Sequence, residues 1–262
     1  MKKRILLGMS GGVDSSASAI LLKEQGYEVI GLTMKLWEKE VSESGDTLVN
    51  PYIDDAKNVC NILGIEHYTA DFSNEFKKCV IHNFIDVYNQ AKTPNPCIEC
   101  NKYIKFKLMY EKAKELGAEY IATGHYAKTE YSNEYSRYVI KRADSEKKDQ
   151  SYVLYNISKD LVEKVIFPLG KFKEKSEIRK IVQKYDLKIA EKPESQEICF
   201  IPDNDYAKFI LNRTNRRPMP GNIVNTKGEI LGKHQGLIHY TIGQRKGLRN
   251  IISRAIVCNK TG

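Results

Sequence analysis

The stretch RILLGMSGGVDSS, residues 4–16, decides the fold of this 262-residue chain. Its first half is a short apolar run typical of a buried strand, and its second half breaks into glycines. The apolar spacing after Asp14 predicts a helix that ends at Gly26. Glycines between a strand and a helix let the backbone approach an anion, and the N–H groups of the helix N-terminus face it. The stretch therefore predicts a phosphate-binding turn after the first strand.

The same alternation of strand and helix patterns continues through the first half of the chain. Apolar strand patterns recur at 27–34, 65–71 and 118–127. Helical patterns separate them, at 52–64, 74–90 and 101–117. Repeated β–α units of this kind predict an α/β fold, in which a parallel sheet has helices on both faces and ligands bind at the carboxyl ends of its strands.

The patterns change after this region. Residues 128–142 predict a β-hairpin, and residues 151–167 and 173–187 indicate helices. The last part of the chain is rich in Gly, Pro and short apolar pieces, which predicts a small, mostly β domain. We therefore expect a catalytic domain over 1–201 and a small central domain over 202–262.

Composition favours a polyanionic partner. The chain has 42 Lys and Arg against 33 Asp and Glu, a formal net charge of +9, and basic surfaces neutralise phosphates. No apolar run is long enough to span a bilayer, and MKKRILLGMSGG breaks into glycines where a signal peptide would have its cleavage site. We therefore expect a cytoplasmic protein without membrane attachment. Its six cysteines are expected to be thiols, metal ligands or catalytic groups rather than structural disulfides.

The residues of the loop indicate which class of nucleotide-binding loop it belongs to. It lacks the G-K-[ST] of a Walker A loop and the G-x-G-x-x-G of a dinucleotide fold. Its order S-G-G-x-D-S, from Ser10 to Ser15, resembles the PP-loop of ATP pyrophosphatases, which hold the pyrophosphate of ATP while they adenylate a substrate. The resemblance implies ATP, with Asp14 helping to hold Mg²⁺. Because synthetases of NAD, GMP and argininosuccinate share this loop, an amide ligase is one alternative.

Five further segments narrow the choice of substrate class. They are TPNPCIECNKYIKF (93–106), ATGHYA (122–127), KDQSYVLY (148–155), SQEICFIPD (195–203) and YTIGQRKGL (240–248). In this order after the loop, they resemble the tRNA-specific 2-thiouridylases, from Lys3 to Leu248. That family installs sulfur at C2 of the wobble uridine of certain tRNAs. Replacing a carbonyl oxygen by sulfur needs a leaving group, which adenylation supplies, and a sulfur nucleophile, which a cysteine persulfide supplies.

The resemblance implies a role for each matching residue. ATP contacts are implied at Gly8, Met9, Ser10, Gly11, Gly12, Val13, Asp14, Ser15, Met34 and Gly124. The target base is implied to face Asn95, Pro96 and Cys97. Contacts with tRNA are implied at His125, Lys148, Asp149 and Gln150. Arg245 and Lys246 fit phosphate contacts, although a solvated basic turn explains these two nearly as well.

Two cysteines are implied to carry the sulfur chemistry. Cys199 matches the persulfide carrier, and Cys100 matches the nucleophile that closes a Cys100–Cys199 disulfide after transfer. We expect a lowered thiol pKa, supplied by Lys102, Lys105 and the N-terminus of the helix that follows Cys100. The sulfur would come from a cysteine desulfurase or a sulfur-relay protein, and the chain is expected to act as a monomer.

Cys97 departs from the family pattern. Well-known members carry Asp at this position, where this chain has a thiol. Cys97, Cys100 and Cys199 could together ligate a [4Fe–4S] cluster whose fourth iron binds hydrosulfide, as in related sulfur-inserting enzymes. A zinc site is the weaker alternative, since no second close pair of ligands is visible. Persulfide and cluster chemistry both stay open.

The end of the chain is a second departure. The family continues past YTIGQRKGL into a C-terminal β-barrel, but residues 249–262, RNIISRAIVCNKTG, do not resemble that continuation. We therefore expect the chain to stop before the barrel. An inactive remnant that binds tRNA or ATP is the resulting alternative to an active enzyme.

Overall fold

The computed structural model describes residues 2–37, 51–187, 189, 198–201, 203–214 and 217–245. The chain forms two compact units, one of residues 1–79 with 97–194 and one of residues 80–96 with 195–262. The expected domain boundary falls on Pro202, outside the described residues, and stays a prediction. Lys246 and residues 249–262 also lie outside the described part of the chain.

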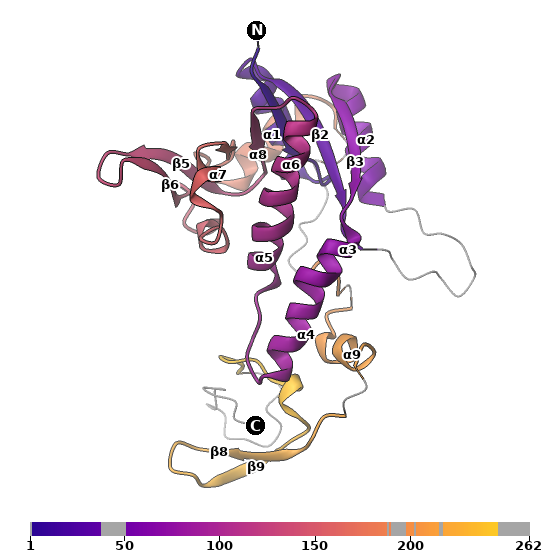
Figure 1. The fold of residues 1–262 in the computed structure, drawn as a ribbon, viewed down its shortest axis with the longest axis vertical. Helices are drawn as coiled ribbons and strands as arrows, with labels where there is room; N and C mark the ends of the chain where they lie inside the picture. The colour runs from indigo at the N-terminus through magenta and orange to yellow at the C-terminus, as the bar shows by residue number, and fades with distance from the viewer. Residues whose placement is uncertain are drawn as a thin grey trace, which may run out of the picture. The chain divides into compact units, whose positions relative to one another are not determined.

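A five-stranded parallel sheet, in the order β3-β2-β1-β4-β7, forms the centre of the first unit (Figure 1). The strands are β1 Arg4–Gly8, β2 Glu28–Lys35, β3 Glu66–Asp71, β4 Tyr120–Ala122 and β7 Val165–Ile166. β1 is central, because Ile5 pairs with Val29 on one side and with Tyr120 on the other. The predicted parallel sheet is therefore confirmed.

Helices cover both faces of this sheet. The helices of the first unit include α1 Val13–Glu24, α2 Pro51–Leu63, α6 Met109–Glu115, α7 Lys159–Val162 and α8 Lys175–Gln183. Successive residues of a strand point to opposite faces. Ile5 and Leu7 accordingly join a buried cluster with α1, α2 and α8, whereas Leu6 joins a second cluster with α6 and α7. Burial on both faces explains why the strands are continuous apolar runs.

Two long helical runs contain π-helical turns. In the first, α3 Ser73–Phe76, η1 Lys77–Ile81 and α4 His82–Asn89 follow one another. In the second, α5 Pro96–Glu99 and η2 Cys100–Leu108 lead into α6. The second run begins at Pro96, five residues before its predicted start, because proline suits the first turn of a helix. Cys97 and Cys100 therefore lie inside the helix rather than before it.

The segment 151–167, predicted as one helix, is broken into three elements. It forms η3 Ser151–Val153, then α7, then β7, which pairs with Ile121 and Ala122 of β4. The β-branched pair Val165–Ile166 favours a strand, and Pro168, two residues after Ile166, could not continue a helix. The hairpin prediction is confirmed as β5 Ala127–Ser132 and β6 Arg137–Arg142. A capping box of Glu174 and Glu177 begins α8 within the predicted segment 173–187.

The second unit is small and combines a hairpin with short helices. Its elements after α4 are α9 Tyr206–Leu211, β8 Gly221–Val224, β9 Ile230–His234 and η5 Leu237–His239. Phe84 of α4 packs edge-on against Phe200 and Phe209, and Tyr88 stacks on Tyr206 at 5.0 Å. The predicted β structure is confirmed. Helix α9 was not anticipated, although Asp205 caps it by accepting a hydrogen bond from the Lys208 amide.

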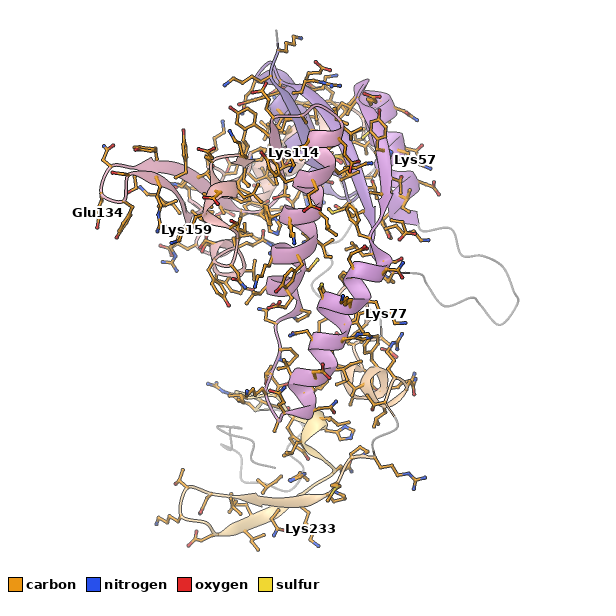
Figure 2. All side chains as sticks on the ribbon, in the orientation of Figure 1. Lys57, Lys77, Lys114, Glu134, Lys159 and Lys233 are labelled. Atoms are coloured by element: carbon orange, nitrogen blue, oxygen red, sulfur yellow. The ribbon has the colours of Figure 1, made fainter. Side chains whose placement is uncertain are left out.

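Lysine side chains are spread over the surface of both units, and Figure 2 labels five of them: Lys57, Lys77, Lys114, Lys159 and Lys233. All five are exposed, which agrees with the basic composition of the chain. No helix in the described ranges is both long and apolar enough to cross a bilayer.

Gly170 packs where a side chain does not fit. A Cβ there would lie 2.6 Å from Lys128 Cγ and 2.8 Å from the carbonyl carbon of Ala127, with the Ala127 oxygen closer still. We expect Gly170→Ala to lower the free energy of unfolding by about 3 kcal/mol, because the backbones must separate. Gly26→Ala has open space but a φ of +86°, so its cost should be about 1 kcal/mol. Urea unfolding monitored by circular dichroism measures both; equal losses would contradict the steric explanation.

Candidate functional site

The glycine-rich loop lies at the carboxyl edge of the sheet, between the end of β1 at Gly8 and the start of α1 at Val13. Two hydrogen bonds attach it to β2: the Met9 amide donates to the Leu32 carbonyl at 2.8 Å, and Thr33 Oγ1 donates to the Met9 carbonyl at 3.0 Å. Ligands of parallel α/β sheets bind at this edge. The structure therefore places the predicted nucleotide loop where a ligand is expected.

Two glycines shape the loop. Gly11 has a φ of +67°, and a Cβ there would lie 2.6 Å from Asp55 Cβ and 2.8 Å from the Tyr52 carbonyl oxygen of α2. Both the conformation and the space thus require glycine at this position. Gly12 is the N-cap of α1 and has no side chain to bind the first-turn amides. An anion can take that place, where the helix dipole also favours negative charge.

Serine hydroxyls hold the loop together. Ser10 Oγ lies 3.2 Å from Ser15 Oγ, and the Ser10 amide donates to Ser15 Oγ at 3.3 Å. Ser15 and Ser16 both donate to the Gly12 carbonyl, at 3.1 and 2.9 Å. Ser15 and Ser16 are buried, whereas Ser10 is exposed. Ser10 is thus the hydroxyl of this group that is accessible to a ligand.

Asp14 is held by two residues that the sequence did not suggest. Tyr126 OH donates to Asp14 Oδ1 at 2.9 Å, and Lys175 Nζ lies 2.6 Å from the same oxygen. The two partners are 112 and 161 residues away along the chain, so no local motif could have revealed them. Lys175 is the first residue of α8, which packs with α1 in one buried cluster. That helix pair brings the ammonium group to the loop.

Two more of the implied ATP contacts lie against the loop. A Cβ on Gly124 would be 3.1 Å from Asp14 Cβ and 3.2 Å from the Ser15 amide nitrogen, so the backbone after β4 closely approaches the start of α1. Met34, near the end of β2, has its Cε 3.6 Å from the position of a Cβ on Gly8. The structure thus brings together the loop, Met34 and Gly124, which come from three neighbouring strands.

His125 lies beside the same strand end in aromatic surroundings. Its Nδ1 is 2.8 Å from Thr123 Oγ1, and its ring is 5.9 Å from Phe106 and 6.3 Å from Phe167. Burial holds the pKa of His125 well below its usual value, and the Lys105 ammonium acts in the same direction. The imidazole is therefore neutral at physiological pH, so it can form hydrogen bonds but carries no positive charge.

Two residues of the implied tRNA segment 148–150 are engaged in hydrogen bonds within the first unit. Asp149 accepts hydrogen bonds from the Ala143 amide and the Ser151 hydroxyl, both at 2.8 Å. Burial alone would raise the pKa of Asp149, but these hydrogen bonds and Arg142 lower it. Gln150 exchanges two hydrogen bonds with Tyr126, through its side-chain oxygen at 3.0 Å and its amide at 2.9 Å. Both residues therefore shape the turn beside Asp14.

The two cysteines of the C-x-x-C stretch have different environments. Cys97 is exposed, in the first turn of the helix that begins at Pro96, whereas Cys100, in the second turn, is 5% exposed. Burial raises the pKa of the Cys100 thiol, Lys105 opposes this change, and Cys97 adds to it. The expected lowering of the pKa of Cys100 is therefore wrong. Cys100 follows the helix start by one turn, so the helix N-terminus does not face it.

The helical run of residues 96–115, which contains Cys97 and Cys100, is here called the cysteine helix, and Asn101 fixes it to a neighbouring segment. Asn101 is 1% exposed, and its Nδ2 donates to the Val153 carbonyl at 3.1 Å. Its Oδ1 is buried and has no hydrogen-bond partner among the described residues. The bond joins the turn of Cys100 to η3, which follows the segment 148–150.

Four further implied residues belong to the second unit. Asn95 is exposed, Pro96 is buried at the start of α5, and Cys199 is exposed next to the buried Phe200. Arg245 is exposed. Cys100 and Cys199 lie in different units, so their pairing depends on how the units are arranged and stays a prediction. Within the described ranges, no three Cys, His, Asp or Glu side chains are grouped to hold a metal ion.

Two family models match consecutive parts of the chain. The model described as tRNA methyl transferase HUP domain matches residues 3–203, and the model described as tRNA methyl transferase PRC-barrel domain matches residues 207–255. Among solved structures, a 4-thiouridine synthetase in complex with RNA and bound ATP covers 80% of this chain and 50% of its own, with 14% identity and a TM-score of 0.50. At 14% identity, the likeness to this synthetase concerns the fold alone.

Curated relatives match across both parts. The tRNA-specific 2-thiouridylase MnmA of Caldicellulosiruptor saccharolyticus is 52% identical over 252 residues, and that of Clostridioides difficile is 49% identical over 250 residues. Each match covers 95% of this chain and 69% of the relative. Identity at this level over nearly the whole chain shows common descent, so the chain belongs to the tRNA-specific 2-thiouridylase family.

Proposed function

We propose that the chain catalyses ATP-dependent 2-thiolation of the wobble uridine of tRNA, with the loop Gly8–Ser15 as its nucleotide site and Cys100 and Cys199 as its sulfur-transfer residues. Its family makes it a tRNA-uridine 2-sulfurtransferase, and the observation that carries this is 52% identity to a 2-thiouridylase across both matched domains. The net charge of +9 suits a tRNA substrate. A cytoplasmic location and a monomeric catalyst are parts of the same proposal.

The loop is suited to activate the uridine through ATP. The glycines and the first turn of α1 would bind the pyrophosphate part of ATP, and Ser10 would add a hydroxyl. Mg²⁺ bound to ATP usually needs only one or two carboxylates from the protein, so Asp14 alone fits this role. Bound Mg²⁺ would offset negative charge on the phosphates. Met34 and Gly124, which lie against the loop, would contact the rest of the nucleotide.

Lys175 is proposed to position Asp14 and to balance its charge. Its ammonium group is 2.6 Å from Asp14 Oδ1, and the two side chains are 15% and 35% exposed, so the pair is only partly screened by water. Without it, a carboxylate would face the triphosphate with no positive group on the same oxygen. Tyr126 supports the same arrangement with its hydroxyl at 2.9 Å.

The sulfur step is proposed to use two thiols. The terminal sulfur of a Cys199 persulfide attacks C2 of the adenylated uridine, and AMP leaves with the former O2. The Cys100 thiol then loses its proton to solvent, and its sulfur attacks the Cys199 sulfur. The bond between the two persulfide sulfurs breaks, so the transferred sulfur stays on C2 and a Cys100–Cys199 disulfide forms. A thiol reductant resets the enzyme, and a desulfurase or sulfur-relay protein reloads Cys199. Amide ligation would not use these two cysteines in any step.

Cluster chemistry is the second candidate and rests on Cys97. Cys97 acts on the pKa of Cys100, so the two thiols lie within electrostatic range. A third thiolate would have to come from Cys199 in the other unit, and Cys100 is buried. These residues fit a cluster less well than they fit thiol exchange, so the proposed steps involve no cluster.

The charge on Lys175 should matter most when Mg²⁺ is absent. We expect Lys175→Met to weaken ATP binding about tenfold without Mg²⁺, because Asp14 then repels the phosphates, and to weaken it less with Mg²⁺. Lys175→Arg should retain most of the affinity. Titration calorimetry measures each, with Lys173→Met, which removes an exposed lysine two residues away, as the matched control. If Lys175→Met lost the same ATP affinity with and without Mg²⁺, and Lys175→Arg lost as much, Lys175 would act through packing rather than through its charge.

The cysteine roles are tested by anaerobic purification followed by iron, sulfide and thiolation assays. We expect Cys199→Ala and Cys100→Ala to lower tRNA thiolation more than about 100-fold, because each removes a thiol that forms a bond in the reaction. Cys97→Ala should keep substantial activity, and the wild-type chain should hold no stoichiometric iron. Full thiolation by Cys199→Ala would refute the sulfur-transfer roles. Iron in the wild type that Cys97→Ala loses together with activity would favour the cluster.

The buried thiol should react more slowly than the exposed one. Iodoacetamide at pH 7 is expected to label the exposed Cys97 well before Cys100, which is 5% exposed. Because its pKa is raised, Cys100 is protonated at neutral pH, so its labelling should increase as the pH rises towards 9. Mass spectrometry of the two sites measures this, with urea-unfolded chain as the control for equal intrinsic reactivity. Labelling of Cys100 as fast as Cys97 at pH 7 would contradict the buried-thiol assignment.

A further inference from the structure

Two tyrosines of the segment that follows residue 150 leave most of their surface in solvent. Tyr152 is 64% exposed and Tyr155 is 71% exposed, whereas Val153 and Leu154 between them are buried. The turn is well fixed, because the Val153 amide donates to the Gln150 carbonyl at 3.2 Å and the Leu154 amide donates to the Ser151 carbonyl at 3.0 Å. The two aromatic rings are therefore presented by an ordered, anchored segment.

This segment adjoins the cysteine helix. The buried hydrogen bond from Asn101 to Val153 joins the two directly. Next to Asn101, the Lys102 ammonium lies 4.7 Å from the centre of the Tyr103 ring. A hydrogen bond with Tyr103 is the main cause that raises the pKa of Lys102, and Tyr155 adds a smaller increase, which places Tyr155 within electrostatic range of Lys102. Aromatic rings and a cation thus share a surface that begins two residues beyond Cys100.

We propose that Lys102, Tyr103, Tyr152 and Tyr155, here called the tyrosine surface, bind the unpaired RNA nucleotides that flank the target uridine. The inference rests on the proposed function and names a specificity surface for it. Proteins recognise single-stranded RNA by stacking its splayed bases on exposed aromatic rings, with cations on the phosphates. An anticodon loop offers such bases on both sides of its wobble position. The tyrosine surface has the matching groups, on and against the helix that contains Cys100.

Two other exposed tyrosines of the first unit pack against each other. Tyr131 and Tyr138, on the hairpin β5–β6, are 51% and 42% exposed, but their rings pack edge-on against each other at 5.5 Å. Each ring therefore already has an aromatic partner. Tyr138→Ala supplies a matched control, because it removes the same side chain from an exposed site in the same unit.

The test is equilibrium binding of an anticodon stem–loop RNA that carries 2-aminopurine next to the wobble uridine, using the full chain without ATP. We expect Tyr155→Ala and Tyr152→Ala each to weaken binding about tenfold and to reduce quenching of the 2-aminopurine, because stacking is lost. Tyr155→Phe keeps the ring and should bind as the wild type does. Lys102→Ala should lower the slope of log affinity against log salt by about one. ATP affinity and the melting temperature should not change in any of these variants.

Other outcomes separate the failure of this inference from that of the proposed function. If the wild type binds the stem–loop and thiolates tRNA while Tyr155→Ala binds equally well, the tyrosine surface does not bind RNA. If RNA binding is unchanged but sulfur loading from a donor protein falls, the surface docks that donor and the RNA assignment is wrong. If Tyr138→Ala weakened RNA binding as much as Tyr155→Ala does, the RNA assignment of the tyrosine surface would also be wrong. A wild-type chain that neither binds nor thiolates RNA would overturn the proposed function itself.

Discussion

The close contact between Gly11 and α2 constrains the rest of the first unit. With a positive φ and no room for a Cβ, this residue fixes where the chain turns from β1 into α1. The hydrogen bonds of Met9 with β2 fix the same turn from the sheet side. The first turn of α1 is thus held from two directions. An anion-binding site needs this rigidity, because its donors must be in place before the ligand arrives.

Around this turn, the site is assembled from elements that are remote in sequence. Lys175 and Tyr126 converge on Asp14, and Gln150 holds Tyr126 through two hydrogen bonds. The nucleotide loop is therefore connected with Gln150, and η3, which follows Gln150, is joined to the cysteine helix by the hydrogen bond from Asn101 to Val153. A change at either place has a short path of polar contacts to the other. Adenylation and sulfur transfer, which must act on one uridine in order, would gain from such a connection.

The predictable part of the structure was the part encoded locally. The strand before Gly8 and the helix after it follow from hydrophobic spacing, and the parallel sheet follows from their repetition. Lys175 could not be found, because its place depends on how α8 packs against α1. The pKa of Cys100 was predicted in the wrong direction, since helix dipole and lysines were weighed without the burial that follows from a helix start at Pro96. Tertiary packing determines both the position of Lys175 and the pKa of Cys100.

The two units are interleaved along the chain, and this limits how the protein can be divided. The polypeptide passes from one unit to the other after residues 79, 96 and 194, so three peptide connections join them. A cut at any one position leaves both units still tethered. A fragment that ended near residue 200 would keep Phe84 but lose Phe209, exposing an aromatic face. Recombination between homologous genes would therefore preserve function more readily when the helix around Phe84 and the C-terminal segment are inherited together.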